Sequence, residues 1–155
     1  MHSRGIVSAI LAAAVLTAPS SYAQGSNQRP ARSAAELAER YRQAHMRKDV
    51  QAITRLFYWG ASTDKTRMLV TSFINQDVAH DIRGVSVEPL DPKDLTEYTQ
   101  DGVKYRVTLP ATAKLVIDFQ PRSVRGGRYN SEQTSYLIGA RNGEYWFVTA
   151  EPSRR

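Results

Sequence analysis

The stretch SAAELAERYRQAHMRKDVQAITRLFYWG, residues 33–60, decides the fold. Ser33 followed three residues later by Glu36 is a capping box, in which each side chain binds a backbone amide that the first helical turn leaves unpaired. Apolar residues then recur at spacings of three and four: Ala34, Leu37, Tyr41 and Ala44. This spacing predicts an amphipathic helix that packs one face against a core.

A second helix is predicted to begin after Asp49, because an aspartate carboxylate is a good N-terminal cap. Its apolar face would comprise Val50, Ile53, Leu56 and Phe57. Gly60 is expected to end this helix, because glycine adopts the left-handed conformation of a helix stop without strain. A third helix, capped by Thr63 or Asp64, is expected to extend to about Ala79. Its buried stripe would consist of Leu69, Val70, Phe73 and Ile74.

From His80 onward the apolar period changes to two, which predicts strands. The pair Asp101-Gly102 indicates a two-residue hairpin turn that places Tyr98 opposite Tyr105 and Glu97 opposite Arg106. Residues 114–119 form the next predicted strand, before a basic loop that contains Arg122, Arg125 and Arg128. Asn142-Gly143 predicts a type I′ turn that pairs Gly139 with Trp146. Helices followed by antiparallel strands define an α+β fold.

The last predicted hairpin is apolar on both faces. Tyr136, Ile138, Tyr145 and Phe147 would share one face, and Leu137, Trp146 and Val148 the other. Helices that cover only one face of the sheet would leave the second apolar face in water. We therefore expect a homodimer that forms through this sheet face.

The N-terminus has the order of a secretory signal peptide. Arg4 precedes an apolar run at residues 6–16, and the small-residue sequence that ends at Ala23 follows. The run is too short to span a membrane, so no transmembrane segment is expected after cleavage. The chain has no cysteine, which excludes disulfides and a lipoprotein anchor. We expect export to the periplasm or the exterior.

The chain has 155 residues, of which 41% are hydrophobic and 23% charged, as in an ordinary globular domain. The predicted organisation is a signal peptide at 1–23, a flexible leader at 24–32, one α+β domain at 33–152 and a basic tail at 153–155. The formal charge of +6 is spread along the sequence and favours anionic neighbours. Nucleic acid is not an expected partner of an exported protein.

The order of these elements, with YRQAHMRKDVQAITRLFYWG early and YWFVTAEP at the end, resembles the nuclear transport factor 2-like superfamily. The resemblance covers about residues 33–152. It implies N-terminal helices packed on a strongly curved antiparallel sheet, in a cone whose open end holds a pocket. The superfamily includes ketosteroid isomerase-like and dehydratase-like enzymes as well as binding and scaffold domains, so the fold alone assigns no function.

Aromatic residues are the candidate lining of such a pocket: Tyr41, Phe57, Tyr58, Trp59, Phe73, Tyr105 and Phe119. The weaker acid and base candidates are His80 with its neighbour Asp81, and Asp77. Capping of the end of the third helix is the simpler role for these three residues. His45 is expected at the boundary of the first helix's apolar face. No catalytic motif, metal-ligand spacing or cofactor loop is present in the sequence, so no metal or cofactor is expected.

The sequence leaves three functions open. The first is an exported, non-enzymatic domain that binds a small apolar molecule or a protein of the envelope. The second is a small enzyme, an isomerase, dehydratase or hydrolase, which needs a titratable side chain inside the pocket. The third is a structural envelope protein that uses a basic surface.

Overall fold

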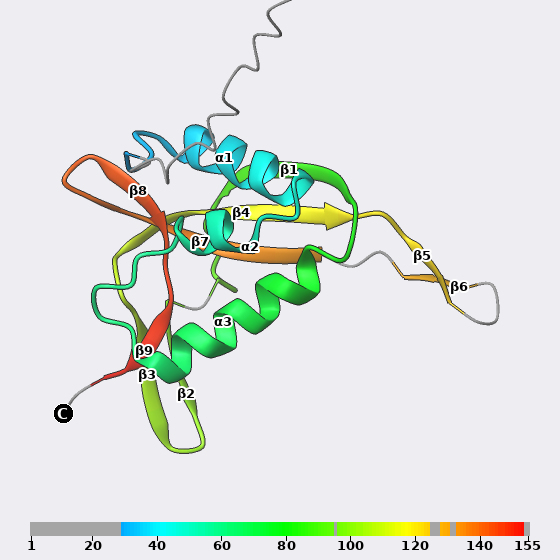
Figure 1. Ribbon diagram of the computed structural model, residues 1–155. Coiled ribbons are helices and arrows are strands. Elements are labelled where there is room, and N and C mark those ends of the chain that lie inside the picture. Colours follow the sequence, from blue (N-terminus) through cyan, green and yellow to red (C-terminus); the bar gives the residue numbers. More distant parts are fainter. Residues whose placement is uncertain (1–28, 95, 125–127, 131–132, 154–155) are drawn as a thin grey trace, which may run out of the picture.

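The computed structural model describes residues 29–94, 96–124, 128–130 and 133–153, and this part of the chain is α+β. The helices are α1 (Ala34–Met46), α2 (Val50–Thr54) and α3 (Asp64–Asp77). The strands are β1 (Ile82–Pro89), β2 (Glu97–Gln100), β3 (Val103–Val107), β4 (Ala111–Phe119), β5 (Arg122–Val124), β6 (Arg128–Asn130), β7 (Gln133–Arg141), β8 (Glu144–Phe147) and β9 (Ala150–Pro152). Figure 1 shows the helices gathered against strands that project in several directions. The predicted signal peptide lies outside the described residues.

The N-terminal helices begin where the capping residues predict. The Ser33 hydroxyl accepts a hydrogen bond from the Glu36 amide at 3.0 Å, and the Asp49 carboxylate accepts one from the Ala52 amide at 2.9 Å. Thr63 caps α3 in the same way. Helix α1 buries Leu37, Tyr41, Ala44 and His45. Ala31, in the predicted leader, is also buried and pairs with Tyr145 of β8.

Helix α2 is shorter than predicted, because it ends at Thr54 and not at Gly60. The backbone leaves the helix to pair with β8: the Phe147 amide donates to the Leu56 carbonyl at 2.9 Å, and the Tyr58 amide donates to the Phe147 carbonyl at 2.8 Å. Gly60 therefore follows an extended segment, and it is not among the glycines with positive φ. The prediction of a glycine stop at this position is wrong.

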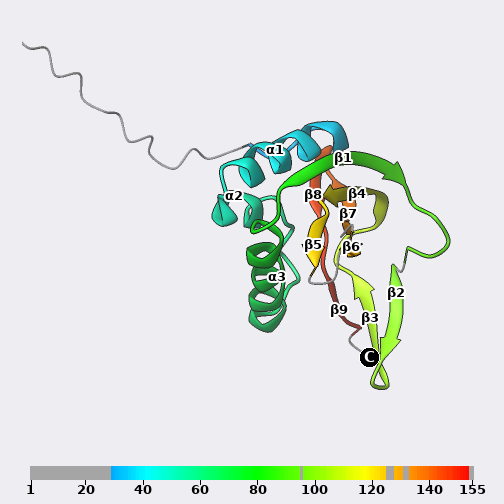
Figure 2. The ribbon, with the colours of Figure 1, turned by 90° about the vertical axis from the view of Figure 1, so that its right-hand side faces the viewer.

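The buried stripe predicted for α3 is also partly wrong. Ile74 is buried, whereas Leu69 is 53% exposed and Phe73 49% exposed. Figure 2 shows α3 below α2, on the side of the molecule opposite β2 and β3, so only one narrow face of the helix meets the core. The side chains of Leu69 and Phe73 lie off that face.

The strands form three antiparallel sheets and not one continuous curved sheet. Their orders are β1-β4-β7-β8, β2-β3-β9 and β5-β6. Both predicted hairpins are confirmed: Tyr98 pairs with Tyr105, and Gly139 pairs with Trp146. Positive φ angles at both residues of each turn fit the type I′ geometry. Two residues of the predicted basic loop, Arg122 and Arg128, lie in the paired strands β5 and β6, and Arg125 lies outside the described residues. The strand predicted at 114–119 begins earlier, at Ala111.

The core lies between the helices and the four-stranded sheet. Leu115 and Ile117 of β4 are fully buried on the face that meets the helices. Tyr41 of α1 contacts Phe147 of β8 edge to face, with ring centroids 5.8 Å apart. Burying such side chains is worth about 1.5–3 kcal/mol each, so this cluster supplies much of the stability of a chain without disulfides.

Candidate functional site

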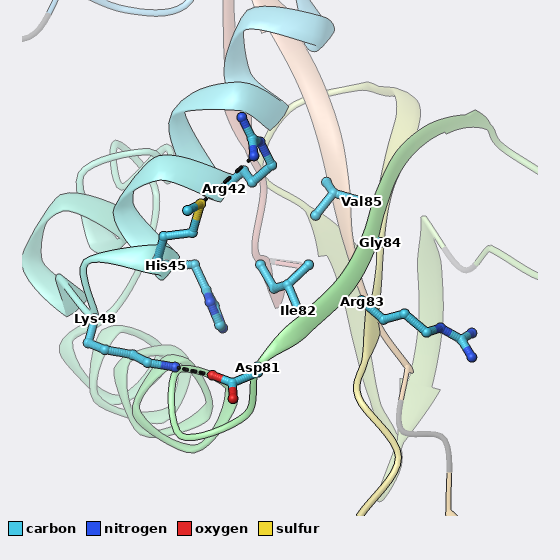
Figure 3. Close-up of a pocket in the computed structure, with 9 residues that line it drawn as sticks. Arg42, His45, Lys48, Asp81, Ile82, Arg83, Gly84 and Val85 are labelled. Atoms are coloured by element: carbon cyan, nitrogen blue, oxygen red, sulfur yellow. Dashed lines mark hydrogen bonds and ion pairs between the residues drawn. The ribbon is translucent and has the colours of Figure 1, made fainter.

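A cleft of about 440 Å³ separates the C-terminal part of α1 from the start of β1. Its lining residues are Arg42, His45, Met46, Lys48, Asp81, Ile82, Arg83, Gly84 and Val85. Figure 3 shows Arg42 near one end, Lys48 and Asp81 at the other, and His45 between them. Pockets of about 300–1,000 Å³ with mixed apolar and polar walls are typical of small-molecule sites.

The end of α1 places Lys48 at this cleft. The Asp49 amide donates to the Ala44 carbonyl, and the Lys48 amide donates to the His45 carbonyl, each at 2.9 Å. These two bonds form a Schellman motif, which puts Lys48 in the left-handed conformation at φ 56°. Glycine is the usual residue at this position, and a lysine there costs about 1 kcal/mol.

The contacts of the lysine side chain offset little of that cost. Its ammonium is 3.2 Å from the Asp81 carboxylate and 3.5 Å from the His80 carbonyl oxygen, but the Lys48 and Asp81 side chains are 46% and 84% exposed. Exposed ion pairs contribute about 0–1 kcal/mol because water screens both charges. The strained backbone at Lys48 therefore positions a cation at the cleft without a matching gain in stability.

A β-bulge shapes the opposite wall. The register between β1 and β4 shifts between Ile82 and Gly84, which inserts Arg83 as an extra residue. In a regular strand Ile82 and Val85 would point to opposite faces, whereas the bulge turns both toward α1. Figure 3 shows this arrangement, with the Arg83 side chain directed away from α1. The bulge thus gives the cleft an apolar wall.

His45 belongs to the cleft and also to the core. It is 1% exposed, so the prediction of a boundary position is wrong. Its Nε2 atom lies 3.1 Å from the backbone carbonyl oxygen of Asp77 and must donate, which leaves Nδ1 as the acceptor of the neutral ring. Burial lowers the pKa of His45, because the charged ring would lose its hydration. The ring therefore adds no charge to the cleft at neutral pH.

The charge of the lining is positive. Arg42, Lys48 and Arg83 stand against the single carboxylate of Asp81. The Arg42 guanidinium is held by Glu39 at 2.8 Å on the same helix, outside the cleft lining. Lys48 and Arg42 therefore flank an apolar wall with cationic groups, which is an arrangement suited to an anion with an apolar body.

Asp77, whose backbone carbonyl accepts the His45 hydrogen bond, belongs to a second cluster of polar side chains. The Tyr136 hydroxyl donates to Oδ2 of Asp77 at 2.6 Å, and the Thr134 hydroxyl donates to Oδ1 at 3.4 Å. Burial raises the pKa of Asp77, and these hydrogen bonds partly oppose the rise. The Tyr41 hydroxyl is buried and has no hydrogen-bond partner among the described residues. The Tyr136 ring of this cluster packs against the rings of Tyr41, Phe57 and Phe147.

The seven aromatic side chains that were predicted to line a pocket lie in different surroundings. Tyr41, Phe57 and Phe119 are buried in the core, and Trp59 stacks on Phe57. Tyr58 packs against Arg141, Tyr105 stacks on Tyr98, and Phe73 is half exposed. The seven side chains therefore do not line one shared pocket.

The acid and base candidates also separate. Asp81 lies at the cleft and Asp77 in the group around Tyr136, while the His80 ring packs 5.5 Å from the Phe119 ring. Within the described ranges, no set of three or more acidic or histidine side chains could hold a metal ion. No described helix is both long enough and apolar enough to cross a membrane.

Sequence reasoning missed Lys48, Ile82 and Val85 as cleft residues. A signal for Lys48 was present, because the helix ends in Arg47-Lys48-Asp49 and no glycine is there to take the left-handed position of a Schellman motif. The bulge that turns Ile82 and Val85 to one side has no comparable signal, because it depends on the register with β4.

No protein-family model matches the sequence, and no curated protein matches it. Among solved structures, a SEC-C motif-containing protein from Rhodopseudomonas palustris is similar over 81% of this chain and 83% of its own. The sequence identity is 14% and the TM-score 0.40. The resemblance to the nuclear transport factor 2-like superfamily is a wrong prediction. No family model or curated protein supports it, and the described strands form three separate sheets and not a single cone.

Proposed function

We propose that this protein is a non-enzymatic binding domain whose α1–β1 cleft holds a small organic anion with an apolar body. The observation that carries the proposal is the left-handed Lys48, whose ammonium lies at one end of the cleft. Strained backbone at a cleft is a reason to ask what its side chain does there. The exposed partner Asp81 does not account for the strain.

The binding step follows from the present contacts. A ligand carboxylate, sulfonate or phosphate takes the place of the Asp81 carboxylate beside the Lys48 ammonium. Because Asp81 is 84% exposed, it returns to water at little cost. The apolar part of the ligand lies against Ile82 and Val85, which the bulge turns toward α1. The N-terminal pattern supports export, so the ligand would be met outside the cytoplasm.

Two fluorescent probes with the same aromatic body test this proposal. One is 8-anilinonaphthalene-1-sulfonate, an anion, and the other is N-phenyl-1-naphthylamine, which lacks the sulfonate. We expect the purified protein to bind the sulfonate more tightly. Lys48→Gly, which keeps the left-handed turn without the ammonium, should weaken sulfonate binding about fivefold and leave binding of the neutral probe unchanged.

The control is Lys93→Gln, which removes an exposed lysine outside the cleft lining and should change neither affinity. Chemical-shift mapping locates the bound probe. The expected shifts centre on His45, Ile82 and Val85. Shifts confined to the exposed apolar residues of α3, or equal affinities of wild type and Lys48→Gly for the sulfonate, would contradict the proposal.

An enzyme is the second candidate, and the observation that favours it is the half-buried Asp77. Its pKa is raised by burial, and the Tyr136 hydroxyl contacts the same carboxylate. A carboxylate with a raised pKa next to a phenol is a candidate proton donor or acceptor. Asp77→Asn would then abolish turnover of a carbonyl substrate while sulfonate binding in the cleft persists. A wild-type protein that binds the sulfonate but turns over no such substrate supports the first candidate.

A further inference from the structure

Strand β1 is an outer strand of the four-stranded sheet, and its outward edge is open. It pairs with β4 on one side, and no other described backbone group bonds to residues 83–89. The bulge at Arg83 limits the open edge at one end, and Pro89, which has no amide hydrogen, limits it at the other. Between them, every second residue of 84–88 directs its amide and carbonyl to the open edge, where these groups can pair with another strand.

The centre of this five-residue window is Ser86. We infer that two copies of this chain pair antiparallel along β1, with Ser86 opposite Ser86 of the second copy. Two-fold symmetry then places Val85 opposite Val87 of the second copy, and Gly84 opposite Glu88 of the second copy. Two four-stranded sheets become one continuous sheet across the dimer.

Apolar side chains support this register. Val85 and Val87 pair with Ile117 and Leu115 of β4, which places both valines on the core face. Val87 is nevertheless 39% exposed, because no strand lies beyond it. The pairing brings Val85 of one copy against Val87 of the other, twice in the dimer, and removes this apolar surface from water.

Charges on the other face support the same register. Arg83 is exposed and forms no ion pair with another described residue. Glu88 accepts a hydrogen bond from the Ser86 hydroxyl at 3.0 Å but has no described cationic partner. Glu88 shares the face of Lys114 in β4, away from α1, and Figure 3 shows Arg83 directed away from α1 as well.

Gly84 leaves room for these two charges to meet. It lies opposite Glu88 of the second copy and next to Arg83 in its own chain. A Cβ atom at Gly84 would be in ordinary contact with the Asp118 carboxylate at 3.7 Å and with no other described side chain within 4 Å, so the missing side chain leaves a space beside that carboxylate. The Arg83 guanidinium can cross this space to Glu88 of the second copy. Symmetry repeats the ion pair, so the register satisfies both charges twice.

Charge exchange tests the inference, with sedimentation equilibrium as the measurement. We expect wild type to dimerise, and Arg83→Glu and Glu88→Arg each to raise the dissociation constant by about tenfold, because each puts like charges face to face. The double variant Arg83→Glu/Glu88→Arg restores opposite charges and should return the constant to the wild-type range. Circular dichroism checks that each variant is folded.

The matched control is Lys65→Glu, a charge reversal at an exposed residue of α3. It should leave the dissociation constant unchanged. A wild type that stays monomeric at high concentration would overturn the inference. A dimer that ignores both single reversals, or that the double variant fails to restore, would overturn it as well, since its contact would lie elsewhere. No ligand is present in this experiment, so its result is independent of the cleft proposal.

Discussion

The Nε2 atom of His45 donates a hydrogen bond to the backbone carbonyl of Asp77 at 3.1 Å, across 32 residues of sequence. This bond joins α1 to the last residue of α3. It also connects the cleft, which the His45 ring lines, with the group around the Asp77 carboxylate. A change of charge on His45 or on the Asp77 carboxylate should therefore change the stability of both α1 and α3.

The first prediction concerns the pH dependence that His45 imparts. Its folded-state pKa is lowered, so the unfolded chain takes up a proton at higher pH than the folded chain does. Stability should be fully present above the unfolded pKa of about 6.5 and should be lost as pH falls below it. Asp77, Asp81 and Lys48 face this ring and modulate the effect.

Urea denaturation at pH 7 and pH 5 measures this loss. In His45→Gln the amide can still donate to the Asp77 carbonyl but does not titrate, so the difference between the two pH values should shrink. An undiminished difference in the variant would assign the pH dependence to other groups.

The second prediction concerns strain at Lys48. Lys48→Gly should raise the free energy of unfolding by about 0.5–1 kcal/mol, because glycine relieves the left-handed strain and loses only the exposed contacts of the ammonium with Asp81 and the His80 carbonyl. Lys48→Ala is the matched control, since it removes the same ion pair but keeps the strain. The alanine variant should be no more stable than wild type in chemical denaturation. Equal stabilities of the glycine and alanine variants would show that the turn is unstrained.

The third prediction concerns the hydroxyls of two neighbouring tyrosines. Tyr136→Phe should cost about 1–3 kcal/mol at pH 7, because the half-buried Asp77 carboxylate loses its shortest hydrogen bond. Losing that bond raises the folded-state pKa of Asp77 further, so the cost should shrink as pH falls and the carboxyl becomes protonated. Thermal denaturation at several pH values follows this trend.

Tyr41→Phe is the control for that experiment. Its hydroxyl is buried without a described partner, so its removal should be neutral or stabilising by up to about 1 kcal/mol. A loss as large as that of Tyr136→Phe would mean that the Tyr41 hydroxyl has a hydrogen-bond partner, such as a buried water.

The fourth prediction separates two neighbours on α3. Ile74→Ala should cost about 2–5 kcal/mol because Ile74 is 1% exposed, whereas Phe73→Ala should cost about 0.5 kcal/mol or less. Chemical denaturation of the two variants gives the comparison. A large cost at Phe73 would mean that this ring is covered in solution, which a partner on α3 would explain.

Local chemistry made part of this fold predictable. Ser33, Asp49 and Thr63 cap their helices because each side chain reaches an amide two or three residues away. The two turn pairs set their hairpin registers because positive φ at both residues admits only a few turns. These features need no information from distant parts of the chain.

The candidate site was harder to predict from local sequence patterns. The sequence predicts His45 at the boundary of the helix's apolar face, because periodicity gives only a direction around the helix axis and the depth of burial depends on what packs there. The sequence predicts Asp77 and Asp81 as acid candidates. That Asp77 contacts Tyr136 whereas Asp81 lines the open cleft depends on how α3 meets β1. The cone that the resemblance implied was wrong, because the order of helices and strands along the chain does not state which strands share a sheet.

By itself, the sequence determined the helix starts, the strand-rich second half and the two tight turns through interactions within a few residues, and it excluded disulfides because it has no cysteine. Only the tertiary structure decided that α2 ends early to pair with β8, that Arg83 forms a bulge, and that Leu69 and Phe73 lie in solvent. The physical reason is that burial and strand register depend on contacts between distant segments. Those contacts form only when the whole chain is packed.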